Sequence, residues 1–318
     1  MLKYVLKRFL VCSGWLFLAL TASIAQAQQS ASLGDRAIST WNTGLVSHQL
    51  EIDNDSLLFQ RRDGFYTSGI RYTQQFDVHG DNRLDRTGWR IGQEIYTASD
   101  IKLAPAAINP LDHPYAGWLY GGVFQSAYLA NGESYRYGLD LGCVGPCSGA
   151  QWTQQNLHRV INQPQPQGWS SQIKDEFGAL LYGEYAPRRW QLGSTLDLTP
   201  SVHARFGNIF TDAGVGVQLR AGQLNQLPDQ STIHAFVRLD ARAVAYDASL
   251  QGGYFSTHNP RTVSPKRAVG EAEIGMVWNQ VPFAVRVSVV RRSSEIAGLS
   301  NAVAAQNFAR LMFSYTPR

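Results

Sequence analysis

Residues 66–77 have the sequence Tyr-Thr-Ser-Gly-Ile-Arg-Tyr-Thr-Gln-Gln-Phe-Asp, in which two kinds of position alternate. One row is mostly apolar or aromatic: Tyr66, Ser68, Ile70, Tyr72, Gln74 and Phe76. The other row is mostly polar: Thr67, Gly69, Arg71, Thr73, Gln75 and Asp77. Successive side chains of a β-strand point to opposite faces, so this stretch predicts a strand with one apolar and one polar face.

The same alternation recurs further along the chain. Within residues 233–244, Ile, Ala, Val and Leu alternate with His, Phe, Arg and Asp, with one slip near the end, and residues 283–289 repeat the pattern. A soluble sandwich turns the polar face of such strands to water. An outer-membrane barrel instead turns the apolar face to lipid and the polar face to its lumen.

Three further features favour the barrel. Many predicted strands reach ten residues or more, which suits a tilted crossing of a bilayer. The chain also contains an alternating segment with aromatic ends at 308–315. Tyrosines and tryptophans gather near predicted strand ends, as an aromatic girdle requires: they are Trp89, Tyr96, Tyr115, Trp118, Tyr120, Tyr182, Tyr185 and Trp190.

We therefore predict an all-β fold, namely an integral outer-membrane antiparallel β-barrel of about twelve strands with a short helix in an extracellular loop. An even strand number is the rule for bacterial single-chain barrels. The predicted strands are 45–58, 64–78, 86–97, 115–129, 133–143, 174–187, 188–203, 208–222, 232–247, 265–280, 281–294 and 305–315.

The composition excludes several other classes of protein. The 318 residues include 28 basic and 24 acidic residues, and 44% are hydrophobic. A helical membrane protein with several spans needs repeated apolar runs of ~20 residues, which this balance does not supply. A charged fraction of 16% together with 29 glycines is also unlike a coiled coil or a disordered chain.

Residues 1–27 are predicted to be a cleaved signal peptide, which leaves 28–318 as a single barrel domain. Three basic residues are followed by an apolar stretch at 9–24, and Ala25-Gln26-Ala27 supplies the small residues of a cleavage site. The apolar stretch is too short to favour the alternative, an uncleaved anchor. Without the three basic residues little remains of the net charge of +4, so no nucleic-acid surface is expected.

Export of the chain changes what its cysteines can do. Cys143 and Cys147 are the two that lie outside the signal peptide, in the sequence Cys-Val-Gly-Pro-Cys. An oxidising compartment allows a small disulfide loop, and free thiols are the alternative. Two thiols without a cluster of further Cys or His ligands do not predict a metal site.

The alternation stops between residues 149 and 169. Residues 151–161 have the pattern of a short helix, on which Gln154 and His158 lie one turn apart on the same face. Pro164 and Pro166 prevent its continuation, so we expect a loop helix at about 151–162. A helix inserted in a barrel loop is a candidate position for chemistry.

Five motifs follow one another in this part of the chain: Asp53-Asn54-Asp55-Ser56, Gly64-Phe65-Tyr66-Thr67-Ser68-Gly69, Gly92-Gln93-Glu94-Ile95-Tyr96-Thr97, Asp112-His113-Pro114-Tyr115-Ala116-Gly117-Trp118 and Gln154-Gln155-Asn156-Leu157-His158. In this order they resemble the outer-membrane lipid A 3′-O-deacylase family, over residues 47 to 185. Two positions depart from the family. His113 stands where it usually has arginine, and Pro164 stands where one type of member has an acidic residue.

The resemblance implies a twelve-stranded barrel in the bacterial outer membrane that uses Ca²⁺ to hydrolyse the 3′ ester of lipid A. Its partners would be lipid A or lipopolysaccharide as substrate and the surrounding lipid, and we expect a monomer. Hydrolysis by water needs a base for the water and a positive group for the developing oxyanion. Imidazole titrates near neutrality, so His158 is the expected base.

The remaining predicted site residues offer polar groups around this base. Asn54 and Asp55 supply hard oxygen ligands for calcium, although they point to opposite faces of a regular strand. Thr67, on the polar face of the next strand, would hold the water, the metal shell or the substrate carbonyl. Gln154 would orient the imidazole or the substrate, and Lys102 would contact a lipid A phosphate.

Each of these residues also has a purely structural interpretation. Asn-Asp at a strand end is a common turn signal, Thr67 alone would fill the lumen, His158 alone would be a solvated helix residue, and Lys102 would be a free loop lysine. Two other functions also remain as alternatives. An outer-membrane phospholipase A-like esterase carries a His-x-Ser motif, which no histidine of this chain begins, and a small porin requires no ordered motifs.

Overall fold

The structure is a computed structural model that describes residues 32–58 and 64–317. The chain divides into two compact units, Met1–Ser39 and Thr40–Arg318, and the barrel belongs to the second. The predicted signal peptide lies outside the described residues and stays a prediction. A helix, α2 (Leu33–Thr43), precedes the first strand.

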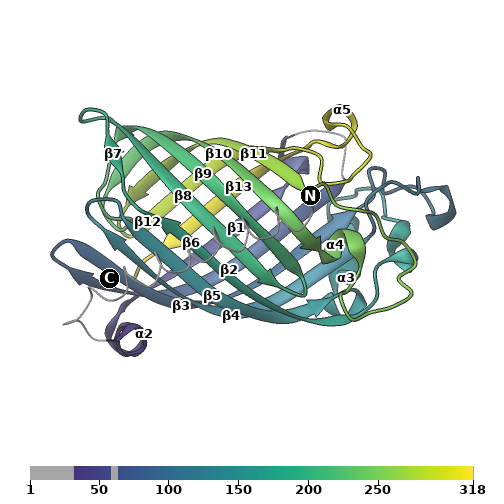
Figure 1. Ribbon diagram of the computed structural model, residues 1–318, viewed down its shortest axis with the longest axis horizontal. Helices are drawn as coiled ribbons and strands as arrows, with labels where there is room; N and C mark the ends of the chain where they lie inside the picture. The colour runs from purple at the N-terminus through teal and green to yellow at the C-terminus, as the bar shows by residue number, and fades with distance from the viewer. Residues whose placement is uncertain (1–31, 59–63, 318) are drawn as a thin grey trace, which may run out of the picture. The chain divides into compact units, whose positions relative to one another are not determined.

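Twelve long strands of the described residues form a closed antiparallel barrel (Figure 1). Each strand pairs with its neighbours along the chain, and β1 pairs with β13 to close the sheet. The strands are β1 (Leu45–Asn54), β2 (Phe65–Gly80), β3 (Arg83–Thr97), β4 (Ala116–Leu129), β5 (Ser134–Val144), β6 (Glu176–Ala186), β8 (Leu196–Gly207), β9 (Phe210–Gln223), β10 (Thr232–Asp247), β11 (Ala268–Gln280), β12 (Phe283–Arg292) and β13 (Gln306–Tyr315).

One predicted strand begins at the wrong place. The strand expected at 188–203 is replaced by a two-residue strand, β7 (Trp190–Gln191), and by β8, which starts at Leu196. Gly193, with a φ of 103°, turns the chain between them, and glycine adopts such an angle without steric cost. β7 therefore folds back on β8, while β6 pairs directly with β8.

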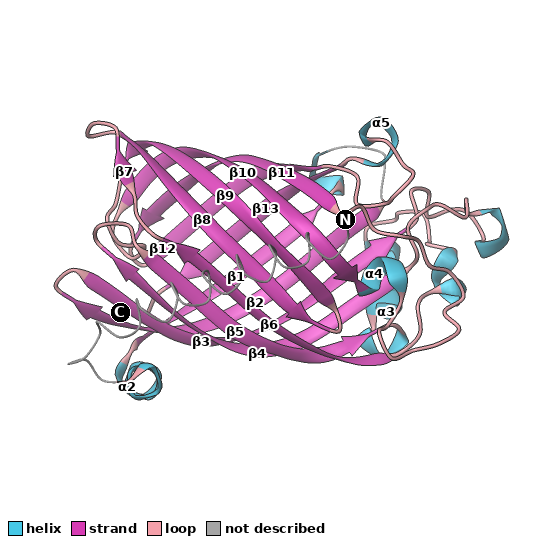
Figure 2. Cartoon of the chain, in the orientation of Figure 1, coloured by secondary structure: helices cyan, strands magenta, loops and turns pink. Residues whose placement is uncertain are grey.

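The long loops follow β1, β3, β5, β10 and β12, which all end on the same side, so these loops meet at one end of the barrel. Figures 1 and 2 show the short helices α3, α4 and α5 gathered there. In outer-membrane barrels the longer loops face the outside, so we call this the extracellular end. The helices in these loops are η1 (Ser56–Leu58), η2 (Pro105–Ala107), η3 (Pro146–Ser148), α3 (Ala150–Val160), η4 (Gly168–Ser171), α4 (Ala248–Gln251) and α5 (Asn301–Ala304).

The two faces of the wall have the character that the alternation predicts. Ile70, Val123 and Ile274 are exposed on the outer surface. Arginines and carboxylates pair inside, for example Arg310 Nε with Asp53 Oδ1 at 2.8 Å. Pairing compensates these charges for the loss of water that burial imposes.

The aromatic girdle is only partly as predicted. Tyr185 and Trp190 are exposed, but Tyr96, Trp118 and Tyr120 are buried and pack in the interior. These three residues occupy strand positions whose side chains point into the lumen. The alternation along the strand, and not the distance from the strand end, decides which way they point. Other aromatic residues are exposed instead: Phe177, Phe206, Tyr254 and Phe255.

The lumen contains two cavities, of about 240 and 860 Å³, lined mainly by charged and polar residues. No helix within the described residues is long and apolar enough to cross a bilayer.

Candidate active site

Helix α3 packs against the outer side of the barrel wall. Trp118 and Tyr120 line the larger cavity, so Gly117 between Ala116 and Trp118 faces outward. A β-carbon at Gly117 would collide with Ser148 and Ala150 at the start of the helix. Glycine at this position therefore allows the helix to approach the wall closely.

The contact around the start of α3 has a small apolar core. Ile95, Tyr115, Ala150 and Trp169 belong to one buried cluster. The side chain of Gln93 donates from Nε2 to the carbonyl oxygen of Ser148 at 2.7 Å. Strands β3 and β4 together thus hold the beginning of α3 in a defined position.

The buried face of α3 carries the two residues that the sequence singles out on it. Gln154 is 2% exposed and His158 is 7% exposed, and both lie on the same side as Ala150. The side-chain oxygen of Gln154 accepts a hydrogen bond of 2.9 Å from Trp169 Nε1. Its amide nitrogen Nε2 is buried and has no hydrogen-bond partner among the described residues.

The segment after the helix determines which nitrogen of His158 carries the hydrogen. Nδ1 lies 2.6 Å from the carbonyl oxygen of Pro164. A carbonyl only accepts, so Nδ1 carries the proton in the neutral ring and Nε2 carries the lone pair. Pro164 therefore orients the His158 ring through its backbone oxygen, a role that does not depend on the type of its side chain.

Thr67 is not a luminal residue, contrary to the predicted alternation. A β-bulge lies between Tyr66 and Ser68, opposite β3. Tyr66 therefore takes the luminal place, with its hydroxyl donating to Asp53 at 3.1 Å. Thr67 is buried in the wall, and its Oγ1 lies 2.7 Å from Oγ1 of Thr97.

The bulge turns the hydroxyl of Thr67 toward the side of the wall where α3 lies. Tyr96 lines the smaller cavity, so its neighbour Thr97 has outward parity, as Ile95 has. A bulge re-aims one side chain without disturbing the rest of the strand, and bulges are frequent near active sites. Neither cavity of the lumen is lined by Thr67.

Asn54 and Asp55 lie at the extracellular end of β1. Asp53 faces the lumen, so Asn54 has outward parity, and Asp55 follows the strand at the beginning of a turn. The side-chain oxygen of Asn54 accepts hydrogen bonds from both the backbone N–H and the hydroxyl of Ser56. The turn interpretation of Asn54 is therefore realised in the structure.

Asp55 is held differently from Asn54. Its side chain is 5% exposed, and Oδ2 accepts a hydrogen bond of 3.1 Å from Gly64 N–H. Its own N–H donates to the carbonyl oxygen of Thr67 at 3.4 Å. The bulged strand thus orders the turn that carries the carboxylate.

Lys102 is an exposed residue of the loop between β3 and β4. Its backbone N–H donates to Asp100 Oδ1 at 2.9 Å, which forms a local turn. The preceding carbonyl oxygen, of Ile101, accepts a hydrogen bond of 2.8 Å from Gln167 N–H. The loop of Lys102 is therefore tied to the segment that follows α3.

His113 carries no counterpart of the arginine charge usual in the resembling family. It is 1% exposed, its ring stacks on Tyr96 at 5.4 Å between centroids, and Nδ1 lies 2.6 Å from the carbonyl oxygen of Pro114. Burial, as the largest influence, lowers the pKa of His113 below its ordinary value. Burial of the ring thus disfavours a charged role for this position.

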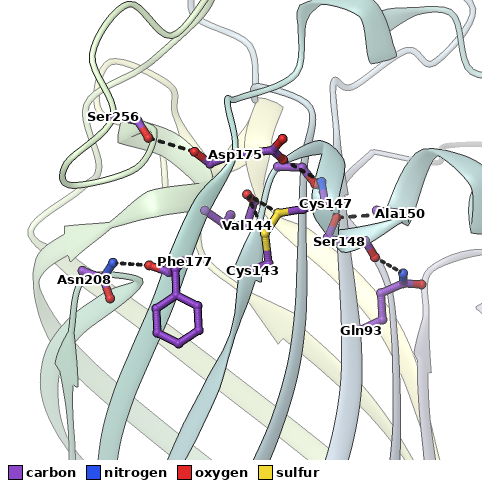
Figure 3. The surroundings of a disulfide bond; sticks show 11 residues. Gln93, Cys143, Val144, Cys147, Ser148, Ala150, Asp175, Phe177, Asn208 and Ser256 are labelled. Atoms are coloured by element: carbon purple, nitrogen blue, oxygen red, sulfur yellow. Dashed lines mark hydrogen bonds between the residues drawn. A yellow bond between two sulfur atoms is a disulfide. The ribbon is translucent and has the colours of Figure 1, made fainter.

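The disulfide between Cys143 and Cys147 fixes the turn that leads into α3 (Figure 3). The backbone N–H of Cys147 donates to Asp175 Oδ1 at 2.6 Å. Both sulfurs and a carboxylate oxygen of Asp175 lie within 4.8 Å of one another. Since the sulfurs are bonded to each other, they offer no thiolate to a metal ion.

The fold brings the predicted site residues to the extracellular end of the barrel, and Gln154, His158 and Thr67 to the outer side of its wall. Gln154 and His158 face the wall from α3, Thr67 turns outward at the bulge, and Asn54 and Asp55 end β1. Neither luminal cavity is lined by any of them, nor by Lys102. Three structural partners were not assigned roles from the sequence, namely Gln93, Thr97 and Trp169. Gln93 and Thr97 lie in a quoted motif, but their partners are distant in sequence.

Comparisons with known proteins agree with this architecture. The sequence profile described as "Outer membrane protein LpxR" matches residues 14–316. The structure of LpxR from Salmonella typhimurium is similar to this one with a TM-score of 0.72 at 21% identity, over 85% of this chain and 100% of that chain.

A second solved structure is more distant. The β domain of the Bordetella autotransporter BrkA has a TM-score of 0.50 at 11% identity, over 86% of this chain and 98% of that chain. No curated protein sequence matches the chain. At these identities the solved structures establish the barrel fold, and the profile, which spans nearly the whole chain, establishes the family. This chain is therefore a member of the LpxR family of outer-membrane proteins.

Proposed function

We propose that this protein hydrolyses the 3′ ester of lipid A, with His158 as the base that activates water and with Ca²⁺ as the metal ion. The family and its five ordered motifs support the substrate class. The observation that carries the proposal is the placement of His158. It lies on the buried face of a helix outside the barrel wall. A backbone carbonyl accepts the hydrogen of Nδ1, which leaves Nε2 as the hydrogen-bond acceptor.

In the proposed reaction, Nε2 of His158 first accepts and then returns a proton. Water attacks the ester carbonyl while Nε2 of His158 takes one of its protons, and the imidazolium then returns a proton to the departing sugar oxygen. The bond from Nδ1 to Pro164 keeps the ring from rotating between the two transfers. The buried amide nitrogen of Gln154 is a donor that has no partner among the described residues, and it would hydrogen-bond to the substrate.

The oxygen groups near the end of β1 fit a calcium ion unequally. Calcium binds carboxylate, amide and hydroxyl oxygens in flexible geometries. The buried carboxylate of Asp55 is suited to this role, whereas the oxygen of Asn54 already accepts from two groups of Ser56. Asp55 is therefore the expected principal ligand. The ion would polarise the ester carbonyl and stabilise the negative charge that develops on its oxygen.

The location of these residues argues against both alternative functions. A porin conducts through its lumen, but none of the candidate residues lines either luminal cavity. A phospholipase A-like mechanism needs a serine nucleophile beside its histidine, and the chain has no His-x-Ser sequence. An esterase site outside the wall is accessible to a lipid of the surrounding leaflet.

The product of the reaction tests the function directly. Lipid A from cells that contain the protein should lack the whole 3′-acyloxyacyl group as one piece, as mass spectrometry would show. Serine-directed fluorophosphonates should neither label nor inhibit the protein, because water attacks directly. A labelled serine, or lysophospholipid released at a comparable rate, would favour the phospholipase alternative. Unchanged lipid A would remove the proposal.

Removing the disulfide should reduce this activity without unfolding the barrel. In a variant with Cys143→Ser and Cys147→Ser, the turn that leads into α3 loses its covalent closure but keeps the Gln93 and Asp175 contacts. We expect ~10-fold slower deacylation, because a shift of ~1 Å in a reacting group costs up to ~100-fold. Heat-modifiable migration in gels would verify the barrel, and an undiminished rate would contradict a positioning role for the disulfide.

A further inference from the structure

The surface of α3 that faces away from the barrel is divided into an apolar and a polar strip. Three apolar side chains are exposed on it, namely Trp152 at 73%, Val160 at 82% and Leu157 at 46%, and Ile161, directly after the helix, is 49% exposed. At 100° per residue Trp152, Val160 and Leu157 lie on one flank of the helix, within an arc of ~140° that also holds Thr153 and Asn156, whereas Gln151, Gln155 and Arg159 occupy the other flank. The buried face with Gln154 and His158 lies between these flanks on the barrel side.

Such a division is unusual for a helix in a watery loop. Three exposed apolar side chains on an eleven-residue helix, with a fourth on the residue that follows it, form an apolar surface that water solvates poorly. A helix with one strongly polar and one apolar flank is the form that lies in the plane of a membrane interface. Tryptophan is among the residues enriched at that level.

The apolar strip is also continuous with the lipid-facing wall. Leu119, Cys143 and Phe177 stand side by side across β4, β5 and β6, and they belong to the outward row. Leu119 and Phe177 are exposed, and Cys143 leads through the disulfide turn into α3 (Figure 3). The first turn of the helix in turn rests on Gly117 in the same row. The helix therefore begins directly at the extracellular border of the lipid-facing surface.

We propose that α3 lies in the outer leaflet, with Trp152, Leu157, Val160 and Ile161 in contact with the acyl chains of the surrounding lipid. Gln151, Gln155 and Arg159 then face the headgroups and water. This inference does not depend on the proposed reaction, because it rests on the outer-membrane location and the surface of the helix. It makes α3 a membrane-contacting element in addition to a loop that covers the wall.

Spin labels on two adjacent residues test the orientation of the helix. Val160→Cys and Arg159→Cys place a nitroxide on the apolar and the polar flank, in protein reconstituted into lipid vesicles. Ile274→Cys, on the exposed outer face of β11, provides the lipid-facing reference. Oxygen concentrates in hydrocarbon and a neutral nickel chelate concentrates in water. The ratio of oxygen to nickel collision rates should therefore be several-fold higher at 160 than at 159, and close to that at 274.

Two results would overturn the proposal. Equal, water-like ratios at 159 and 160 would mean that the apolar strip faces solvent. Protection of 160 from both reagents would mean that protein, such as a second copy of the chain, covers it. As a second measurement, phospholipids with brominated acyl chains should quench the fluorescence contributed by Trp152, taken as the difference between the native protein and Trp152→Phe. Lack of that quenching would contradict the insertion even if a label disturbed the helix.

Discussion

Replacing His158 with alanine should slow lipid A deacylation by ~100-fold or more, as loss of a general base commonly does. The barrel should remain folded and heat-modifiable, because the side chain lies outside the wall and contributes to none of the strand pairing. The measurement is the rate of 3′-acyloxyacyl release from purified lipid A by the reconstituted protein, followed by mass spectrometry.

A second substitution separates the base from the structural anchor. His158→Asn retains an N–H that can donate to the carbonyl of Pro164, so the end of α3 stays fixed, but an amide nitrogen cannot take a proton from water. It should be nearly as slow as His158→Ala. His79→Ala is the matched control and should keep its activity, because His79 lies at the end of β2 that is away from the extracellular loops. A fast His158→Asn protein would show that the imidazole holds the loop in place and does not act as a base.

Removing calcium should abolish the activity, and adding it back should restore the rate better than magnesium does. The expected ligands are side-chain oxygens of a turn, and their flexible geometry suits the larger ion. Magnesium demands a near-octahedral shell and gives up its water reluctantly. The measurement is the rate after exhaustive chelation and titration with each ion. An unchanged rate after chelation would exclude the metal mechanism while leaving the role of His158 to its own test.

The two neighbouring residues should differ in this titration. Asp55→Asn keeps the shape of the side chain but removes its charge, and it should raise the calcium concentration for half-maximal rate by ~10-fold or more, because ligand charge tunes calcium affinity. Asn54→Ala should have the smaller effect, since its oxygen is already engaged by Ser56. The exposed Asp81→Asn, in the turn between β2 and β3 at the other end of the barrel, serves as the control. Equal effects of the two site substitutions would mean that Asn54 leaves Ser56 to bind the ion.

Much of the fold could be predicted because β-strand patterning is local. A half-buried strand needs an apolar residue at every second position, so its extent and its faces appear in the sequence without knowledge of its partners. All twelve long strands were predicted in this way, and the short loop helix was observed at Ala150–Val160. The displaced start of β8 follows from a backbone turn at Gly193, which alternation does not report.

The predicted site residues were chosen by chemical type and spacing, and these too are properties of the sequence. Gln154 and His158 share a face because they are one helical turn apart, wherever the helix lies. The turn formed by Asn54 and Ser56 is equally local. These contacts involve residues that are close along the chain, so the sequence alone limits them to few possibilities.

Only the tertiary structure decided on which side of the wall these groups lie. The bulge at Thr67 depends on the register between β2 and β3. Because of it, the hydroxyl of Thr67 lies beside Thr97 and not in the lumen, where the alternation places it. The outward position of α3 depends on Gly117, which leaves room for Ala150 although the two residues are distant in sequence. The alternation determined that the chain forms strands with one apolar and one polar face. Register and close packing between distant segments determined where the site lies, because neither leaves a periodic trace in a single segment.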